Sequence, residues 1–195
     1  MELYPVNLKL KDQLCLIVGG GKIAHEKIQN LLASEAVVDV VSPQLIPELE
    51  LLCSQKKFHW ISREFIPTDI SDLYGLIIAC TNNPRVNQEI YDLSIQSGKL
   101  INCVDEPQRC NFYVPSIVQR GDLQISISTS GNAPLLSKSI RQHLENVFNE
   151  TILSKLEAIY QLRKDIVEEN KNKSQRIEME LKPEINRFIN QLNWT

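Results

Sequence analysis

Leu14-Cys15-Leu16-Ile17-Val18 runs directly into Gly19-Gly20-Gly21-Lys22-Ile23-Ala24, so a buried strand leads through a glycine turn into a helix. Gly19 suits the tight turn, Gly21 lets the backbone approach a phosphate, and the small Ala24 lets the helix pack close to the strand. The start of the helix also offers N–H groups and the positive end of its dipole. This order predicts a bound nucleotide pyrophosphate, although glycine turns also join ordinary strands to helices.

Outward from this stretch, strand and helix signals alternate through the first half of the chain. Apolar or β-branched runs at 14–18, 37–41, 58–62, 76–79 and 100–104 alternate with helical patterns that begin near residues 22, 46 and 84. Repeated strand–helix units of this length predict a parallel sheet with helices on both faces. We therefore expect an α/β, Rossmann-type NAD-binding domain over residues 1–114.

The pattern changes in the second half. Ile117-Val118 and the alternating run 123–127 flank a turn at 120–122, which predicts a hairpin. One face of that hairpin needs a cover, and a partner subunit is an attractive one. Helical patterns follow to near the end of the chain, with Pro183 expected to kink or restart the last helix. We expect a small α+β dimerisation hairpin and helix over 115–149 and a C-terminal helical domain over 150–195.

Composition narrows the function classes. The formal net charge is −3, with 43% hydrophobic and 23% charged residues, so nothing in the total points to nucleic acid. No apolar run approaches the length of a membrane span, and the first residues lack a signal-peptide pattern. The five cysteines are scattered without a C-x-x-C pair, and the three histidines lie far apart. We expect a cytoplasmic protein with no metal site and no disulfide framework.

Ligands of open α/β sheets bind beyond the carboxyl ends of the strands. Those ends carry four groups that we expect to share one site: Gly19-Gly20-Gly21, Ser42-Pro43, Thr81-Asn82-Asn83 and Asp105. Thr81 and Asn82 suit a ribose or nicotinamide contact, or simply a capped helix start. Asp105 suits proton transfer, or is a turn residue before a proline. NAD-selective sites often place an acidic residue at the end of the second strand, where it holds the ribose 2′-hydroxyl. Asp39 lies inside its strand and Ser42 is neutral, so this rule does not decide between NAD and NADP here.

Basic and hydroxyl side chains follow in the second half. Arg109, Arg120, Lys138 and Arg141 form a local basic patch or are scattered solvated charges. The run 126–134, Ser-Ile-Ser-Thr-Ser-Gly-Asn-Ala-Pro, holds a carboxylate or phosphate or merely caps a helix.

Four segments together resemble the precorrin-2 dehydrogenase/sirohydrochlorin ferrochelatase family, the dehydrogenase module of siroheme synthases. They are 16–24, 102–105, 112–117 and 127–134. The resemblance implies oxidation of the tetrapyrrole precorrin-2 to sirohydrochlorin with NAD as cofactor, and a homodimer. It implies that Asp105 is the general base. Two features depart from the family pattern: Asn132 stands where a second glycine is common, and no methyltransferase domain follows, so we expect a stand-alone dehydrogenase.

The resemblance also assigns residues to ligands. Lys22, Ile23, Pro43 and Gln44 match cofactor-contact positions, which join Gly19, Gly20, Gly21, Ser42, Thr81 and Asn82 in the expected NAD site. The expected tetrapyrrole contacts are Asn111, Arg120, Ser128, Thr129 and Lys138. Two alternatives stay open: a bifunctional enzyme that also inserts iron into sirohydrochlorin, and a non-catalytic NAD-sensing regulatory module.

Overall fold

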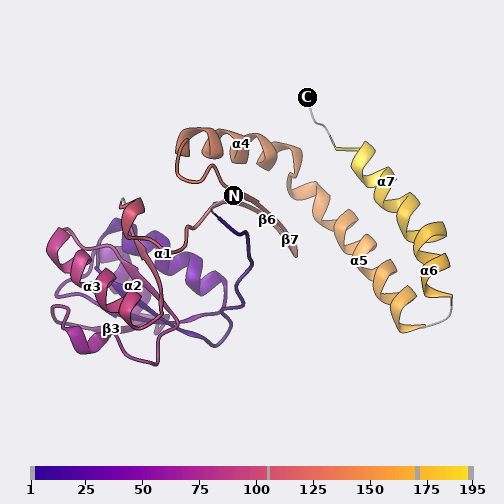
Figure 1. Cartoon of the computed structure of the whole chain (residues 1–195). Helices are drawn as coiled ribbons and strands as arrows, with labels where there is room; N and C mark the ends of the chain where they lie inside the picture. The colour runs from indigo at the N-terminus through magenta and orange to yellow at the C-terminus, as the bar shows by residue number, and fades with distance from the viewer. Residues whose placement is uncertain (1–2, 105, 170–171, 193–195) are drawn as a thin grey trace. The chain divides into compact units, whose positions relative to one another are not determined.

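The computed structural model describes residues 3–104, 106–169 and 172–192 (Figure 1). Contacts divide the chain into two compact units, one ending at Tyr113 and the other beginning at Val114. A further division at residue 149 stays a prediction. No helix in the described part of the chain combines the length and apolar character that crossing a bilayer requires.

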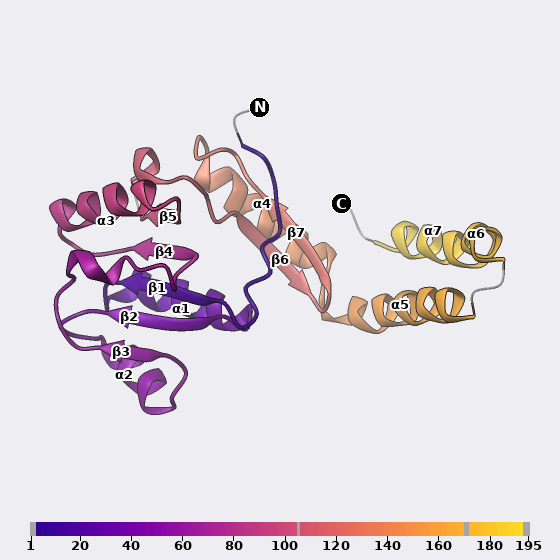
Figure 2. The same cartoon turned by 60° about the horizontal axis from the view of Figure 1, so that its bottom comes forward.

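The first unit is built on a five-stranded parallel sheet in the order β3-β2-β1-β4-β5 (Figure 2). Its strands are β1 (Leu14–Val18), β2 (Val37–Val41), β3 (His59–Ile61), β4 (Leu76–Ala79) and β5 (Leu100–Cys103). The order of strands reverses direction between β1 and β4, which is where open α/β sheets bind their ligands. The predicted α/β fold class is therefore confirmed.

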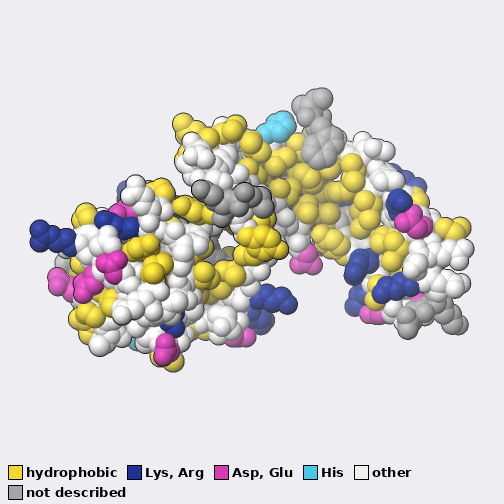
Figure 3. Space-filling model, in the orientation of Figure 1, with side chains coloured by type: hydrophobic (Ala, Val, Ile, Leu, Met, Phe, Trp, Pro, Cys, Tyr) yellow, Lys and Arg dark blue, Asp and Glu magenta, His cyan; other side chains and the backbone are white. Residues whose placement is uncertain are grey.

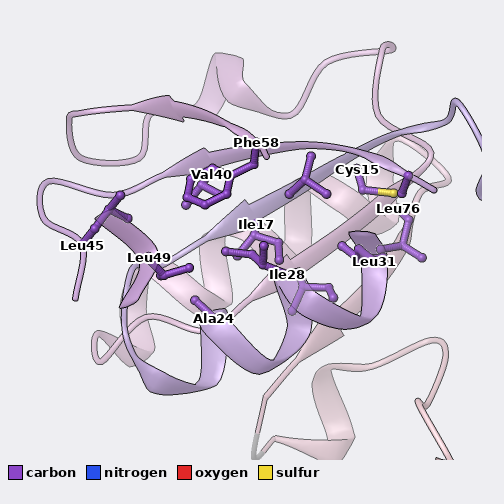
Figure 4. Close-up of a cluster of buried hydrophobic side chains, with 13 residues drawn as sticks. Cys15, Ile17, Ala24, Ile28, Leu31, Val40, Leu45, Leu49, Phe58 and Leu76 are labelled. Carbon is purple, nitrogen blue, oxygen red and sulfur yellow. The ribbon is translucent and has the colours of Figure 1, made fainter. Parts of the chain in front are cut away.

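Helices cover both faces of this sheet, which explains why its central strands are almost continuously apolar. On one face, α1 (Lys22–Ala33) and α2 (Pro47–Ser54) pack through Ala24, Ile28 and Leu49 onto a buried cluster (Figure 4). On the other face, α3 (Pro84–Gln96) packs through Ile90, beside the short 3-10 helix η1 (Pro67–Asp69).

The edge strands are short or covered. Strand β3 is shorter than the run 58–62 predicts, because its register with β2 extends only over Asp39–Val41. The outer edge of β5 is covered by the chain that returns after the 3-10 helix η2 (Pro107–Arg109). There the Asn111 N–H donates to the Ile101 carbonyl at 3.0 Å, and the Asn111 Oδ1 accepts from the Ile101 N–H at 2.8 Å.

The second unit begins with the predicted hairpin, formed by β6 (Ser116–Arg120) and β7 (Leu123–Ile127). Helix α4 (Pro134–Val147), the 3-10 helix η3 (Glu150–Ile152) and α5 (Leu153–Glu168) follow. The buried core of this unit is Val118, Val147, Phe148, Ile152, Leu156 and Leu192. Only the later part of the predicted apolar stripe on α4 joins this core, since Leu136 and Ile140 are exposed.

The last helical stretch comprises α6 (Lys173–Arg176), the π-helical turn η4 (Ile177–Leu181) and α7 (Lys182–Asn190). Pro183 stands in the first turn of α7, directly after the π-helical turn. Proline has no N–H for the carbonyl of the preceding turn, so a local change of helical hydrogen bonding accommodates it. The kink or restart expected at Pro183 thus takes the form of a change from π-helical to α-helical hydrogen bonding, with α7 beginning one residue earlier at Lys182.

Candidate functional site

The glycine turn lies at the carboxyl end of β1, wedged between the ends of its two neighbouring strands. Gly19 has φ +131°, and a Cβ built on it would lie 2.6 Å from the Cys80 carbonyl oxygen after β4. A Cβ on Gly20 would lie 2.1 Å from the Gln44 carbonyl oxygen after β2. A Cβ on Gly21 would meet no atom within 4 Å. The first two glycines therefore make close packing possible, whereas Gly21 faces open space.

Helix α1 begins at this open space. Gly21 is its N-cap residue, with φ −95° and ψ −168°, and no side chain caps the helix. The first N–H groups of a helix have no intrahelical acceptor, and here the first turn contains no acidic side chain to compete for them. Lys22 and Ile23 are exposed in this turn, whereas Ala24 is fully buried against the sheet. The turn thus leaves room for a pyrophosphate, and the residues present fit a dinucleotide.

Backbone hydrogen bonds join the end of β2 and the loop after it to the glycine turn. The Gly19 N–H donates to the Val41 carbonyl at 2.9 Å, and the Ile46 N–H donates to the Gly20 carbonyl at 3.0 Å. The Ser42 hydroxyl is buried and donates to the Gln44 carbonyl at 2.6 Å, so it shapes the loop. Pro43 and Gln44 are exposed beside it.

The loop after β4 combines capping and exposed amide groups. Asn83 caps α3 by accepting from the Arg85 N–H at 3.0 Å, in line with the capped helix start that the sequence offers as an alternative. The Thr81 hydroxyl donates to the Asn87 Oδ1 at 2.7 Å and accepts from the Asn83 N–H at 3.1 Å. Thr81 therefore organises this helix start, while Asn82 stays exposed. The structure thus brings together the glycine turn and the predicted residues of both neighbouring loops.

A polar cluster that was not predicted from the sequence is centred on Asp39 of β2. The Tyr74 hydroxyl donates to the Asp39 Oδ2 at 2.6 Å, and His59 Nδ1 lies 3.4 Å from the Asp39 Oδ1. Burial and this hydrogen bond raise the pKa of Tyr74. Burial alone would raise the pKa of Asp69, but the Arg63 guanidinium and the Ile66 N–H hold it below its usual value. No local signal predicts these pairs, because their partners are separated along the chain.

Three residues with predicted roles, Asp105, Arg109 and Asn111, follow β5 in the chain. Asp105 lies outside the described residues; its neighbour Val104 donates its N–H to the Ala79 carbonyl at 2.9 Å. Asn111, a predicted substrate contact, uses its side chain to cover β5, because its Nδ2 also donates to the Lys99 carbonyl at 2.8 Å. Arg109 pairs with Glu106. A substrate role for Asn111 stays a prediction, although its side-chain bonds serve the fold.

In the second unit, Arg120 also serves the fold. Its guanidinium donates to the carbonyls of Phe148 and, at 3.2 Å, Glu145, which close the end of α4. Arg141 pairs with Glu145, while Lys138 is exposed. Arg109 belongs to the first unit, whereas Arg120, Lys138 and Arg141 belong to the second. A basic patch shared by all four therefore stays a prediction.

The hydroxyl-rich loop before α4 makes a tight turn. Ser130 and Gly131 have φ +54° and +79°. The Thr129 hydroxyl accepts from the Ala133 N–H and the Ser128 hydroxyl from the Ser130 N–H, both at 3.2 Å. Asn132 is not among the residues with positive φ, so an asparagine is accommodated there without left-handed backbone. Substrate contacts by Ser128 and Thr129 stay predictions.

Within residues 3–104, 106–169 and 172–192, no three or more His, Cys, Asp or Glu side chains are grouped so that they could hold a metal ion. All five cysteines, which lie in this part of the chain, are free thiols.

A glycine turn that opens a helix at the reversal point of a parallel sheet defines a dinucleotide-binding protein of the Rossmann type. Residues 6–116 match the family model described as "Putative NAD(P)-binding", which covers more than half of the chain. The chain belongs to this putative NAD(P)-binding family. Residues 120–146 match a second model, "Sirohaem biosynthesis protein central".

Curated siroheme synthases are similar to this chain. The chain is 37% identical over 147 residues to a siroheme synthase of Acinetobacter baylyi, covering 75% of this chain and 32% of the relative. It is 32% identical over 152 residues to a siroheme synthase of Zymomonas mobilis, covering 78% of this chain and 32% of the relative. The chain thus spans about a third of the length of these relatives. The predicted resemblance to siroheme synthases is confirmed.

A solved structure matches both units. "SirC, precorrin-2 dehydrogenase" superimposes with a TM-score of 0.79 and 25% sequence identity, covering 96% of this chain and 100% of that chain.

Proposed function

We propose that this chain oxidises precorrin-2 to sirohydrochlorin, with NAD as the hydride acceptor. The observation that carries the proposal is the likeness to SirC, precorrin-2 dehydrogenase, over 96% of this chain and 100% of that chain. A dinucleotide-binding domain alone supports many reactions, because one fold hosts many functions. The likeness here extends through the second unit, which such domains do not share in general.

In this proposal the carboxyl edge of the sheet binds and orients the cofactor. Bound NAD supplies the redox chemistry by accepting a hydride. The N–H groups at the start of α1, from Lys22 and Ile23, donate to the pyrophosphate across the space that Gly21 leaves open. The loops 42–44 and 81–82 bracket that space on both sides, which suits contacts to the ribose and nicotinamide ends.

We propose that Asp105 is the general base that takes up the proton released in the oxidation. Removal of a hydride from the reduced macrocycle leaves one proton to be taken up as conjugation extends, and a carboxylate at the end of β5 is suited to take it. The assignment rests on the family resemblance and on the position of Asp105 two residues after the end of β5 at Cys103.

The second unit is assigned to substrate recognition and pairing. Precorrin-2 is rich in carboxylates, and the exposed Lys138 with the hydroxyls of Ser128 and Thr129 offers matching donors. Apolar side chains on α4 are exposed, with Leu135 at 80%, Leu136 at 54% and Ile140 at 37%. Figure 3 shows hydrophobic side chains gathered on the visible face of this unit. An exposed apolar surface of this kind supports a homodimer, and the five free thiols suit the cytoplasm.

The decisive experiment is to incubate the purified chain with precorrin-2 and NAD and to follow the absorbance of sirohydrochlorin and of NADH. Equal formation of both products is the expected result. NAD binding without turnover would contradict the dehydrogenase and favour a nucleotide-sensing module. Addition of Fe²⁺ to the accumulated product then shows whether the same chain also inserts iron.

A further inference from the structure

Helix α1 carries a lysine that is held close to the protein and that the proposed cofactor contacts do not use. Lys27 follows Ala24 by three residues and precedes Leu31 by four, and both of these belong to the buried cluster that α1 covers (Figure 4). Lys27 therefore borders the packed face of the helix. Its side chain is only 18% exposed, and its ammonium lies 3.0 Å from the Oε1 of Glu26, which is 68% exposed. The chain thus keeps this cation beside the protein, with a partner that itself reaches into solvent.

The geometry of a helix directs the Lys27 side chain toward the glycine turn. The Cα–Cβ bonds of an α-helix tilt toward its N-terminus, so a long side chain covers the turn before its own. For Lys27 that turn begins at Ile23, whose N–H is one of the donors proposed for the pyrophosphate. Four residues of helix rise by about 6 Å, and lysine carries its ammonium on a flexible four-carbon stem. The ammonium can therefore reach the level at which the first N–H groups of α1 lack an intrahelical acceptor.

The thiol of Cys80 connects Lys27 to the glycine turn. Its Sγ donates to the Val18 carbonyl at 3.4 Å, and a Cβ built on Gly19 would lie 2.9 Å from the same sulfur atom. Burial raises the pKa of Cys80 to about 12, and the positive charge of Lys27 acts against that rise. The charge of Lys27 therefore acts on a group that is packed directly against Gly19.

The ion pair between Lys27 and Glu26 is one that a bound pyrophosphate can replace. Each phosphate of a dinucleotide carries a negative charge, and the start of a helix offers only roughly half a positive charge to them. The pair with the exposed Glu26 contributes little, because solvent screens an ion pair at the surface. Phosphate oxygens accept strong, charge-assisted hydrogen bonds from an ammonium. An exchange of Glu26 for a phosphate is therefore favourable.

We propose that Lys27 is a cofactor-binding residue whose ammonium exchanges Glu26 for the pyrophosphate when a dinucleotide binds. In this arrangement the backbone N–H groups hold the phosphates from the end of α1, and Lys27 holds them from its flank. The inference rests on the proposed function only in placing a dinucleotide at the glycine turn. It adds a side chain beyond the glycine motif to contacts that otherwise come from the first turn of α1 and from the two neighbouring loops.

Isothermal titration calorimetry of the full chain tests this with NAD⁺ and with ADP-ribose, which keeps the pyrophosphate and lacks the nicotinamide. Lys27→Met retains an apolar stem without the charge and should raise the Kd for both ligands at least about fivefold. A smaller change for either ligand overturns the inference alone, and a loss confined to NAD⁺ would assign the ammonium to the nicotinamide instead. Failure of the wild-type chain to bind either ligand overturns the proposed function together with it.

Glu26→Gln is the matched control, since it removes the carboxylate partner and leaves Lys27 in place. Its NAD affinity should stay within about threefold of wild type or increase. A greater loss would show that binding needs the ion pair itself, and it would contradict the exchange. Thermal unfolding without ligand establishes that each variant is folded, and Lys27→Gln replaces Lys27→Met if the latter does not fold.

Discussion

Gly20 and Gln44 are in such close contact that a Cβ atom on Gly20 would lie 2.1 Å from the Gln44 carbonyl oxygen. The Gly20 carbonyl in turn accepts from the Ile46 N–H at 3.0 Å, so the glycine turn and the loop after β2 form one packed unit. Gly21, one residue further on, has no such neighbour. Adjacent glycines of one motif therefore have different roles, and substitution can separate them.

Gly20→Ala should destabilise the fold by about 1–3 kcal/mol, because the backbone of the loop must move to admit the methyl group. Gly21→Ala is the matched control: its backbone angles suit alanine, so stability should change by less than about 1 kcal/mol. The added methyl group should instead lower NAD affinity at least about tenfold by occupying the phosphate space. Urea unfolding and calorimetry measure the two effects, and equal destabilisation by both variants would refute the division of roles.

Asp105→Asn should lower the rate of precorrin-2 oxidation by about 100-fold or more, since amides do not accept the proton. NAD affinity should stay within about twofold, because the cofactor contacts proposed above lie elsewhere. Single-turnover absorbance and NAD titration test this. Full activity of the variant would rule out Asp105 as the base.

Tyr74→Phe should destabilise the first unit by about 1–3 kcal/mol, because it removes the hydrogen bond to the largely buried Asp39 carboxylate. Tyr91→Phe, which alters a half-buried tyrosine against the same cluster, should change stability by less than about 0.5 kcal/mol. Urea unfolding compares the two variants. If Tyr74→Phe is as stable as wild type, the Asp39–Tyr74 bond contributes nothing to the fold.

Stability should fall as the pH rises above 9. Burial raises the pKa of Cys15 to about 11 and those of Cys80 and Cys103 to about 12, from an ordinary value of 9.0. A thiol with a raised pKa holds its proton more tightly in the folded chain, so its contribution is complete below pH 9 and is lost between pH 9 and about 12. Thermal midpoints at pH 7, 8.5 and 10 measure the decline. Cys15→Ala should show a shallower decline, and a midpoint that rises to pH 10 would contradict the argument.

Arg120→Ala should destabilise the second unit by about 1–3 kcal/mol, because the guanidinium donates to carbonyls at the end of α4. Lys138→Ala, at an exposed position on the same helix, should leave stability within about 0.5 kcal/mol. It should raise the KM for precorrin-2 several-fold if Lys138 binds a carboxylate. Unfolding curves and steady-state kinetics separate the two residues, and a KM effect of Arg120→Ala without loss of stability would support the predicted substrate contact of Arg120 and contradict its structural role.

The sheet and the glycine turn were predictable because their determinants are local. Continuous apolar runs mark strands that are covered on both faces, and Gly19 to Ala24 follow one of them directly. The use of Arg120 and Asn111 was not predictable, since their partners lie 28 and 10 residues away. A basic or amide side chain looks the same in sequence whether it binds a ligand or a backbone carbonyl.

The apolar stripe on α4 shows a second limit. The spacing of Leu136, Ile140, Leu144 and Val147 predicts one face, and the helix does present it. Only the later residues are buried within the unit, because the core formed with Ile152 and Leu156 covers one end of the helix. Periodicity identifies an apolar face but does not identify what covers it.

The sealed outer edge of β5 bears on how copies of this chain can associate. Asn111 occupies hydrogen-bonding groups that a further strand would need, and at the opposite edge β3 offers only the short span His59–Ile61. The nucleotide-binding sheet therefore resists growth by strand addition, which is the route by which exposed edges lead to aggregation. Evolution could thus lengthen or reshape the hairpin unit for assembly without putting the solubility of the cofactor domain at risk.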